Sequence, residues 1–188
     1  SARWISSDLT SSKVTVSADL VVSSYVMNEM AKKDRQFVLD NLWSAAKEML
    51  LIVEPGTPAG FAVLKDTREY LLNKGAHIAA PCPHENKCRL AEDDWCHFTC
   101  RVQRSKIHKI LKDADVPYED EKYTYMAYVK EEYTHAKSRI LRHPYIEKGQ
   151  VSLEICSATE NKSVAVKKKD GKLFKTARKA KHGDSIHI

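Results

Sequence analysis

Glycine-rich turns, membrane-length apolar runs and closely paired cysteines are all missing from this sequence. The six glycines in 188 residues form no turn of the kind that cradles a nucleotide cofactor. No apolar run approaches the length of a membrane span, so we expect no membrane partner. The five cysteines are an odd set without a CxxC pair, which argues against a closed disulfide framework and against the usual zinc knuckle. A reducing compartment such as the cytosol or the mitochondrial matrix fits this cysteine usage.

A signal peptide and an obvious catalytic arrangement are also missing. The chain begins at Ser1 without an initiator Met, so we expect an upstream part that carried any targeting segment. No Ser/His/Asp or Cys/His pattern stands out, and His108, His135 and His143 are scattered in the way that structural histidines are. A chain of this length with 43% hydrophobic residues predicts one domain with its own core, or one such domain with a small appendage.

Positive charge is concentrated at the end of the chain. Residues 162–188 contain nine Lys or Arg and two Asp, a formal charge of +7, and the whole chain carries +6. The remainder is therefore close to neutral. A neutral body with a basic tail indicates an anionic partner, usually nucleic acid, although a solvated tail that only aids solubility would look the same.

The first half of the chain alternates between predicted strands and helices. Residues 18–24 are a continuous apolar run, which predicts a strand covered on both faces of a parallel sheet. A second such strand is predicted at 49–54 and an extended piece at 76–81, and residues 3–5 are a possible further strand. The helix between the first two strands is predicted from apolar residues at helical spacing: Phe37, Val38, Leu42, Ala45 and Met49.

The second helix carries its own start and stop signals. Thr57 can cap it, with Pro58 at the first position, and Gly75 suits the end of a helix that runs to about Asn73. Strand, helix, strand, helix and strand at this spacing predict an α/β fold with a parallel sheet.

The second half reads differently. Residues 101–112 predict a basic helix with Val102, Ile107, Ile110 and Leu111 directed inward. Residues 121–129, 151–156 and 163–168 predict strands, with a hairpin turn at Asp170-Gly171. We expect this end of the chain to be antiparallel.

The segment between these halves holds three cysteines and little periodicity. Cys82, Cys88 and Cys96 lie in a loop that needs an ordering element other than packing, and thiolate ligation would supply one. Iron–sulfur clusters accept such irregular spacing. The fourth ligand stays open between Cys100, Cys156, His84 and His97, and a histidine would favour zinc. Buried, inert thiols are the alternative, but the flanking Pro, His, Lys, Glu and Asp residues make a poor core.

Polar residues follow the predicted parallel strands, where such sheets bind ligands. Ordinary turn and cap residues would look the same. The candidates for contacts with a nucleoside-type cofactor are Asp8, Ser24, Tyr25, Asn28, Glu54 and Gly56.

Basic residues at two places could contact phosphates, although a solvated helix face is the commoner reason for such a pattern. The candidates in the predicted basic helix and in the tail are Arg101, Arg104, Lys106, Lys109, Lys167, Lys168, Lys169, Lys175, Arg178, Lys179 and Lys181.

Taken together, the sequence resembles the methyltransferase-like proteins of the mitochondrial ribosomal small subunit, which have bacterial relatives. The resemblance runs from Asp19 to Asp184 and is most specific at the cysteine loop and at Glu54–Phe61. It is carried, in order, by residues 19–30, 53–61, 80–84 with Cys88, 95–98, 101–105, 118–123, 151–156 and 177–180.

The resemblance implies the carboxyl-terminal part of a class I S-adenosylmethionine methyltransferase-like (Rossmann-like) α/β sheet, with a cysteine-rich cluster loop and a small antiparallel β extension. It implies a methyltransferase-like domain at 1–150 without its amino-terminal half, with the cysteine loop at 81–100, and a β extension with basic tail at 151–188. It also implies a four-cysteine iron–sulfur site, of the 4Fe–4S type, on Cys82, Cys88, Cys96 and Cys156. Cys100 lies outside the family pattern.

Three functions follow in order of preference. The first is a protein of the mitochondrial matrix that assembles or stabilises the small mitoribosomal subunit, with rRNA and ribosomal proteins but no DNA as partners and a structural cluster. The second is an active rRNA methyltransferase whose donor, S-adenosylmethionine, is bound by the full-length protein, with Ser24, Tyr25 and Asn28 clamping the acceptor amine. The third is a zinc-stabilised RNA-binding module.

Overall fold

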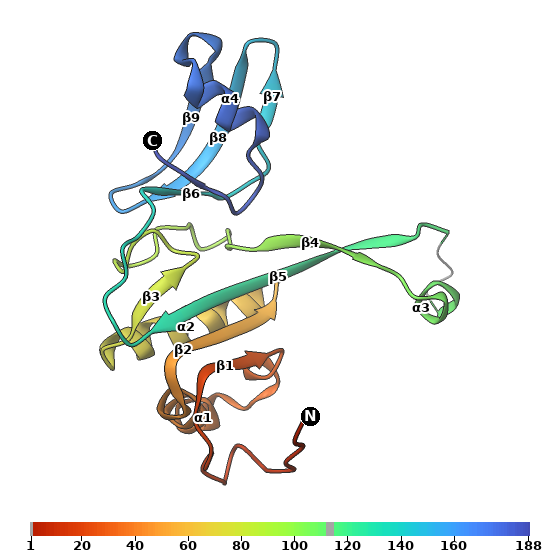
Figure 1. The fold of residues 1–188 in the computed structure, drawn as a ribbon, viewed down its shortest axis with the longest axis vertical. Coiled ribbons are helices and arrows are strands. Elements are labelled where there is room, and N and C mark those ends of the chain that lie inside the picture. Colours follow the sequence, from red (N-terminus) through yellow and green to blue (C-terminus); the bar gives the residue numbers. More distant parts are fainter. Residues whose placement is uncertain (1, 112–114) are drawn as a thin grey trace.

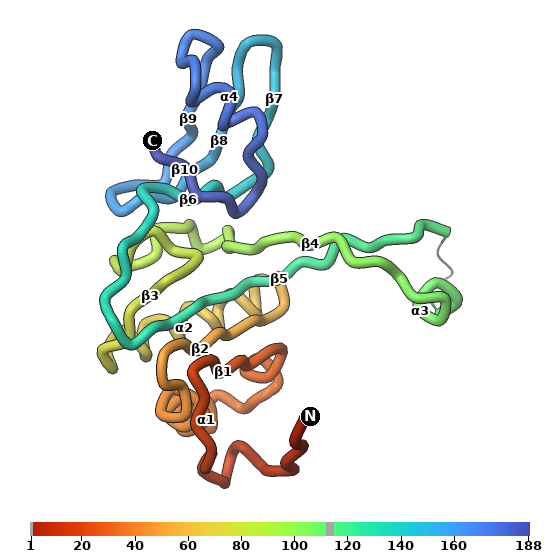
Figure 2. Tube along the Cα trace, viewed as in Figure 1, coloured from red at the N-terminus to blue at the C-terminus, as the bar shows by residue number. Residues whose placement is uncertain are grey.

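Two sheets placed end to end make up an elongated molecule (Figures 1 and 2). The computed structural model describes residues 2–111 and 115–188, and within these residues each sheet has five strands. The first sheet contains β1 (Ala18–Ser24), β2 (Ala46–Pro55), β3 (His77–Ala80), β4 (Phe98–Gln103) and β5 (Tyr118–Val129). The second contains β6 (Ser138–Ile140), β7 (Tyr145–Glu147), β8 (Gln150–Ser157), β9 (Asn161–Lys167) and β10 (Ser185–Ile186).

The first sheet confirms the predicted α/β alternation. The sheet itself is mixed and not purely parallel, because β5 runs antiparallel to its neighbours. Its strand order is β1-β2-β5-β3, with β4 pairing the far part of β5. β1 and β2 are parallel and are joined by η1 (Met27–Glu29) and α1 (Lys32–Ala45). β5 is antiparallel to both β2 and β3, so β2 and β3 run in the same direction on either side of it, connected by α2 (Pro58–Asn73).

Helix α2 begins and ends where the sequence predicts. The side chain of Thr57 accepts a hydrogen bond from the backbone N–H of Gly60 at 3.1 Å, and Pro58 occupies the first turn. After the last helical residue the chain leaves through Gly75, whose φ of +81° suits glycine. The inward face carries Gly60, Val63, Leu64, Thr67, Arg68 and Leu71.

Both α1 and α2 pack on the same face of the first sheet. Leu50 and Ile52 of β2 lie in one core cluster with Val38 of α1 and Leu64 of α2. The expectation that residues 18–24 are fully buried is wrong, because β1 is an edge strand whose outer face carries no helix among the described residues. Leu20 is 52% and Val22 53% exposed on that face.

Three smaller expectations in this region also fail. Phe37 is exposed rather than inward, and Met49 belongs to β2 and not to the preceding helix. Residues 3–5 form no strand, and Trp4 is almost fully exposed. Each expectation rests on apolar character alone, which does not decide burial at an edge.

The predicted basic helix over 101–112 is wrong for residues 101–105 and confirmed for residues 106–111. Residues 98–103 are β4 instead, paired with β5 in a two-stranded arm that projects from the body (Figure 1). Opposite charges face each other there: the Arg101 guanidinium donates to the Asp120 carboxylate at 2.8 and 3.0 Å. Helix α3 (Lys106–Leu111) begins only at the end of the arm, and residue 112 lies outside the described residues.

The apolar residues of α3 are not inward. Ile107, Ile110 and Leu111 are 70–80% exposed, and Val102 of β4 is 46% exposed. Their spacing suits a helix, but the arm carries them away from both cores.

The second sheet is antiparallel throughout, as predicted for the end of the chain. β8 is its central strand and pairs with β6, β7 and β9. The buried residues of β8 are Val151, Leu153 and Ile155, on one face, as the alternation predicts. The expected domain boundary at residue 150 stays a prediction. The sheet that contains β8 begins earlier in the chain, at Ser138 of β6.

The expected hairpin at Asp170-Gly171 is wrong. Lys168–Asp170 is a 3-10 turn (η2), Gly171 has φ +55°, and the chain continues as helix α4 (Lys172–Lys179). Leu173, Phe174 and Ala177 pack this helix onto the second sheet's core. The packing of these three residues holds α4 against the second sheet. The basic tail is therefore part of a folded unit. Within the described residues, no helix is long and apolar enough to cross a membrane.

Gly60→Ala tests the start of α2. A Cβ at residue 60 would lie 2.1 Å from the carbonyl oxygen of Pro55, which is backbone and cannot yield cheaply. Alanine normally favours a helix by about 1 kcal/mol over glycine, but overpacking costs about 1–3 kcal/mol or more, so we expect a net loss of stability. Urea unfolding measures it, with exposed Ala59→Ser as the control, expected to change within about 0.5 kcal/mol. An unchanged or raised midpoint for Gly60→Ala would contradict this packing.

Candidate metal centre between the two sheets

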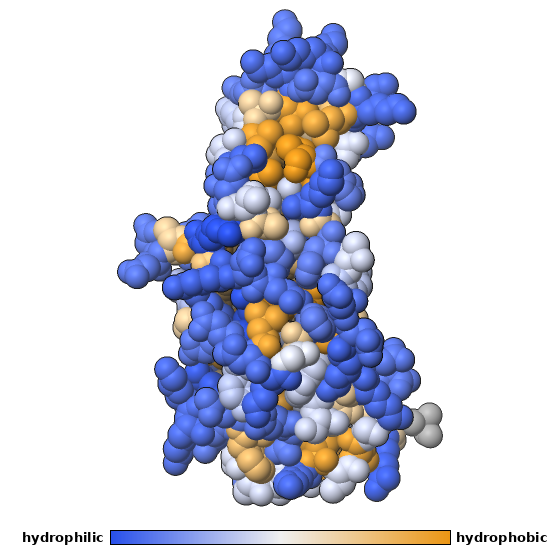
Figure 3. Space-filling view, turned by 90° about the vertical axis from the view of Figure 1, so that its left-hand side faces the viewer, coloured by the Kyte–Doolittle hydropathy of each residue, from blue (hydrophilic) through white to orange (hydrophobic). Residues whose placement is uncertain are grey.

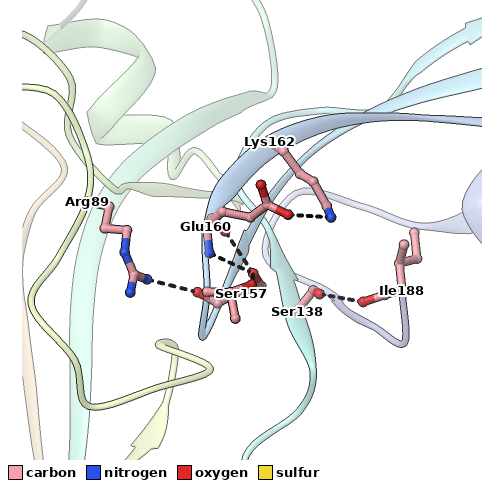
Figure 4. Close-up of polar contacts among 7 residues, drawn as sticks. Arg89, Ser138, Ser157, Glu160, Lys162 and Ile188 are labelled. Atoms are coloured by element: carbon pink, nitrogen blue, oxygen red, sulfur yellow. Dashed lines mark hydrogen bonds and ion pairs between the residues drawn. The ribbon is translucent and has the colours of Figure 1, made fainter.

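The loop between β3 and β4 lies where the two sheets meet (Figures 1 and 2). It has no strand or helix over residues 81–97, and side chains tie it to its surroundings. The Arg139 guanidinium, from β6, donates to the Pro81 carbonyl at 2.7 Å. Asn86 and Arg89 donate to backbone carbonyls of the β8–β9 turn at 3.2 and 3.5 Å, and Figure 4 shows the Arg89 contact with Ser157. The loop is thus fastened to the second sheet by hydrogen bonds from side chains.

Trp95 ties the other end of the loop to the first sheet. Its indole N–H donates to the carbonyl of Gly56 at 3.0 Å, at the end of β2. Gly56 itself donates to the carbonyl of Lys122, and a Cβ there would lie 2.6 Å from the backbone nitrogen of Tyr123. Gly56, a candidate for cofactor contact, is therefore required by close backbone approach.

Four of the five cysteines line one cavity at this junction. Cys82, Cys88 and Cys96 come from the loop, and Cys156 comes from β8 of the second sheet. The cavity has a volume of about 40 Å³ and is otherwise walled by side chains such as Leu64, Met126 and Leu141. The fifth cysteine, Cys100, is exposed on β4 and is not among the lining residues. The structure thus brings together the four cysteines of the family pattern and leaves out the fifth.

Burial controls the protonation of these thiols. It raises the pKa of Cys96 far above the ordinary thiol value, and the neighbouring thiols Cys82, Cys88 and Cys156 raise it further. Burial likewise raises the pKa of Cys156 to about 12, with Cys82 and Cys88 adding to the effect. Without a cation, Cys96 and Cys156 therefore stay protonated at neutral pH. A metal would reverse this, because thiolate is the form that ligates.

Arginines surround the four cysteines. Arg68 and Arg139 oppose the burial that raises the pKa of Cys82. Arg142 acts in the same direction on the pKa of Cys96, and Arg89 on that of Cys156. Four thiolates exceed the positive charge of a zinc ion or of an oxidised iron–sulfur core, so the filled centre would be anionic. The surrounding cations match that charge.

Two buried side chains have unsatisfied nitrogen atoms: Arg68 lines the cavity, and His84 contacts Cys156. Arg68 of α2 is 3% exposed and His84 is 5% exposed. Among the described residues, the Arg68 Nε and the His84 Nδ1 have no hydrogen-bond partner. His84 places its Nε2 3.5 Å from the Cys156 sulfur, and burial, followed by the Arg68 charge, lowers the pKa of this imidazole. Unsatisfied buried N–H groups are rare, so the Arg68 Nε fits a site that holds an acceptor.

The sulfurs surround the cavity without converging on one point. Across the part of the chain that the structure describes, no group of three or more His, Cys, Asp or Glu side chains is close enough to hold a single metal ion. Four ligands of a zinc ion would converge to about 2.3 Å from it. Whether Cys82, Cys88, Cys96 and Cys156 are ligands stays a prediction.

Sequence reasoning missed Arg68 and Arg139. Arg68 had a detectable signal, because it occupies an inward position of α2, one residue after Thr67 and four after Leu64. A charged residue at such a position is uncommon and marks a buried interaction. Arg139 had no such signal, because its strand is three residues long.

The candidates for a nucleoside-type cofactor are brought together in part. Glu54 is fully buried, and its two carboxylate oxygens accept the backbone N–H groups of Met27 at 2.8 Å and Asn28 at 3.2 Å. Ser24 and Tyr25 lie at the same edge, where the N–H of Tyr25 donates to the carbonyl of Val53 and Tyr25 has φ +56°. This geometry shows Glu54 ordering the turn after β1. Its contact with a cofactor stays a prediction.

Asp8 belongs to a separate turn. It is exposed, and its carboxylate accepts hydrogen bonds from Thr10 and Ser11. These bonds, led by that of the Thr10 hydroxyl, lower the pKa of Asp8. Asp8 therefore stabilises its own turn through these hydrogen bonds.

The predicted phosphate-binding residues fall into two groups. In the arm, Arg101 pairs with Asp120 and stacks on Tyr118, while Arg104 pairs with Glu119 at 3.2 Å; Lys106 and Lys109 lie on α3. The group on the second sheet is exposed: Lys167, Lys168, Lys169, Lys175, Arg178, Lys179 and Lys181. Figure 3 shows the upper part of the molecule as largely hydrophilic around one apolar patch. The second group keeps its charge available to a partner, whereas the two arginines of the arm already have acidic neighbours.

Comparison with known proteins decides the family. The family described as mitochondrial small ribosomal subunit Rsm22 matches residues 1–187. The chain belongs to this family. The predicted resemblance is thereby confirmed, and so is a mitochondrial location.

The matches to two relatives cover only a small part of those proteins. It is 34% identical over 94 residues to the human "Ribosome assembly protein METTL17, mitochondrial", covering 45% of this chain and 21% of that protein. It is 35% identical over 82 residues to the Schizosaccharomyces pombe "Rsm22-cox11 tandem protein 2, mitochondrial", covering 37% of this chain and 11% of that protein. The chain thus spans about a fifth or less of these relatives.

Glu54→Gln tests the buried carboxylate. Burial raises the pKa of Glu54, against the opposing effect of its backbone hydrogen bonds. Because the pKa of Glu54 is higher in the folded state, its protonated form contributes to the free energy of unfolding below the ordinary glutamate pKa of about 4.3. This contribution is lost as the pH rises through the folded-state pKa. Glutamine keeps an acceptor but does not titrate. We therefore expect the wild type to lose free energy of unfolding relative to Glu54→Gln from about pH 4 upward, in urea titrations at several pH values. A free energy of unfolding of the wild type that stays constant or rises with pH relative to that of Glu54→Gln would refute the assignment.

Proposed function

We propose that this chain is part of a mitochondrial-matrix protein that assembles or stabilises the small mitoribosomal subunit. In this proposal it binds rRNA and holds a structural iron–sulfur cluster on Cys82, Cys88, Cys96 and Cys156. The observation that carries the proposal is that these four thiols, from two different sheets, line one cavity. Membership of the Rsm22 family supports the ribosomal role, and the human relative is named a ribosome assembly protein.

The cluster's role would be to join the two sheets. Three ligands belong to the loop after β3 and one to β8, so ligation would cross-link segments that belong to separate strand ladders. The bound cluster would supply iron–sulfur bonds, which replace the packing that residues 81–97 lack. The surrounding arginines would offset its negative charge. A 4Fe–4S type agrees with sulfurs spread around a cavity, and zinc is the alternative.

The basic surface of the second sheet is the proposed rRNA contact. Lys175 and Lys179 are exposed on α4, and Lys167 to Lys169 lie beside them at the end of β9 and in η2. Exposed cations on a folded surface bind phosphates at little ordering cost. The cluster would hold this surface in a fixed position relative to the first sheet.

We further infer that the first sheet is the carboxyl-terminal part of a Rossmann-like, class I methyltransferase-like sheet. Parallel strands β1, β2 and β3 with helical crossovers support this assignment. S-adenosylmethionine binding and methyl transfer to rRNA remain predictions for a longer chain. Both carboxylate oxygens of Glu54 already accept backbone N–H groups, so its contribution to donor binding would be indirect.

Cysteine substitution tests the cluster. We expect Cys82→Ser, Cys88→Ser, Cys96→Ser and Cys156→Ser each to reduce the iron and sulfide content, because each removes one ligand. Cys100→Ser is the matched control and should keep the wild-type content. Elemental analysis and absorption spectra of anaerobically purified protein measure both. Zinc in place of iron would select the zinc alternative, and a wild type without either metal would overturn the proposal.

Charge removal tests the RNA contact. Lys175→Gln with Lys179→Gln should weaken binding of a structured RNA and should reduce the slope of log K against log salt by about one for each phosphate that is no longer neutralised. Arg101→Gln should have a smaller effect, because Asp120 already pairs with that guanidinium. Lys33→Gln on α1 removes a charge far from this surface and is the control. For a comparison at equal net charge, equal effects of the single variants Lys33→Gln and Lys175→Gln would show that only net charge matters.

A further inference from the structure

We propose that Arg68 and His84 are positioning residues of the metal centre, each donating an N–H hydrogen bond to one of its sulfurs. Arg68 would donate to a sulfur of the centre near Cys82, and His84 would donate to the sulfur of Cys156. Together these bonds would set the reduction potential of the centre and the rate at which the protein loses the metal. This inference rests on the proposed four-cysteine centre.

Arg68 is a buried cation without an acidic partner among the described residues. It lies on the inward face of α2, and its Nη2 donates to the carbonyls of His84 at 3.1 Å and Asn86 at 2.8 Å. Carbonyls satisfy N–H groups but do not neutralise a charge, and an unpaired buried charge is strongly unfavourable. Arg68 and Cys82 line the same cavity. An anionic centre bound there would be the missing counter-charge.

The free N–H of Arg68 points to the same acceptor. Its Nε has no hydrogen-bond partner in the described chain, although Nη2 of the same guanidinium donates to two carbonyls. Nearly all buried N–H groups in folded proteins are paired. A thiolate or a bridging sulfide in the cavity would accept this bond, and a neutral thiol is a weak acceptor by comparison.

His84 connects the centre's two halves. Its Nε2 lies 3.5 Å from the sulfur of Cys156, on the second sheet, while its backbone carbonyl is held by Arg68 of the first. The imidazole is 5% exposed, so water does not compete for this contact. With the proton on Nε2, His84 donates to the sulfur of Cys156 and fixes where that ligand sits.

These bonds have a defined chemical consequence. Hydrogen bonds to cluster sulfurs and a nearby cation stabilise the reduced, more negative state, so they raise the reduction potential. They also stabilise the thiolate form of the ligands, which slows metal loss. Removing either donor should therefore shift the potential to more negative values and speed release.

The test uses the whole chain, purified without oxygen. Arg68→Met and His84→Leu remove the donors; Arg68→Lys retains the charge, and His84→Gln retains an N–H at the ε position. Lys33→Met controls for net charge. We expect the first two to shift the potential to more negative values in EPR-monitored titrations and to release metal to a chelator about 10- to 100-fold faster. His84→Gln should restore values close to wild type, and Arg68→Lys should restore part of the shift.

The outcomes separate this inference from the proposed function. A wild type that holds the centre, with all variants equal to it in potential and release rate, overturns the inference and leaves the cluster intact. A wild type that binds no metal removes both. If zinc is the metal, the release rate alone decides. If circular dichroism shows that Arg68→Met or His84→Leu does not fold, the conservative variants Arg68→Lys and His84→Gln decide. A His84→Gln variant that loses all metal would make His84 a ligand and overturn its role as a donor.

Discussion

The contact between the two sheets depends on a segment that forms no backbone ladder of its own. Residues 81–97 lie between β3 and β4 and are held by side chains that donate to carbonyls on either side, such as Arg139 to Pro81 and Trp95 to Gly56. Hydrogen bonds of this kind contribute about 1 kcal/mol each and are individually replaceable. In the proposed function the four thiols at the same place would bond to a common centre, which would be a stronger and more specific connection.

The sequence predicts the structure well where the decisive contacts are between residues close in the chain. Both ends of helix α2 agree with the prediction, because Thr57, Pro58 and Gly75 act within one turn of each end. Residues 101–112 have the pattern of one helix but begin as strand, because the pairing of β4 with β5 depends on partners about twenty residues away, such as Arg101 with Asp120. Periodicity alone carries no information about such partners.

The candidate site shows the same division. The three loop cysteines stand out by their unusual surroundings, whereas the choice of Cys156 over Cys100 comes from a family resemblance. The structure gives a physical reason for that choice, since Cys156 on β8 lines the cavity and Cys100 sits exposed on the arm. Arg68 and His84 need the folded structure, because their unsatisfied nitrogens exist only once α2 and the loop are packed together.

The open edge of β1 has a practical meaning for any preparation of this chain. No strand among the described residues pairs with β1 on the side away from β2, and such an edge, with Leu20 and Val22 exposed on one face, is a template for self-association. The Asp19–Lys47 ion pair places charge at the start of that edge, at 3.9 Å, and opposes such stacking at one end. If samples self-associate at high concentration, we expect this strand to be the contact, independently of the basic surface on the second sheet.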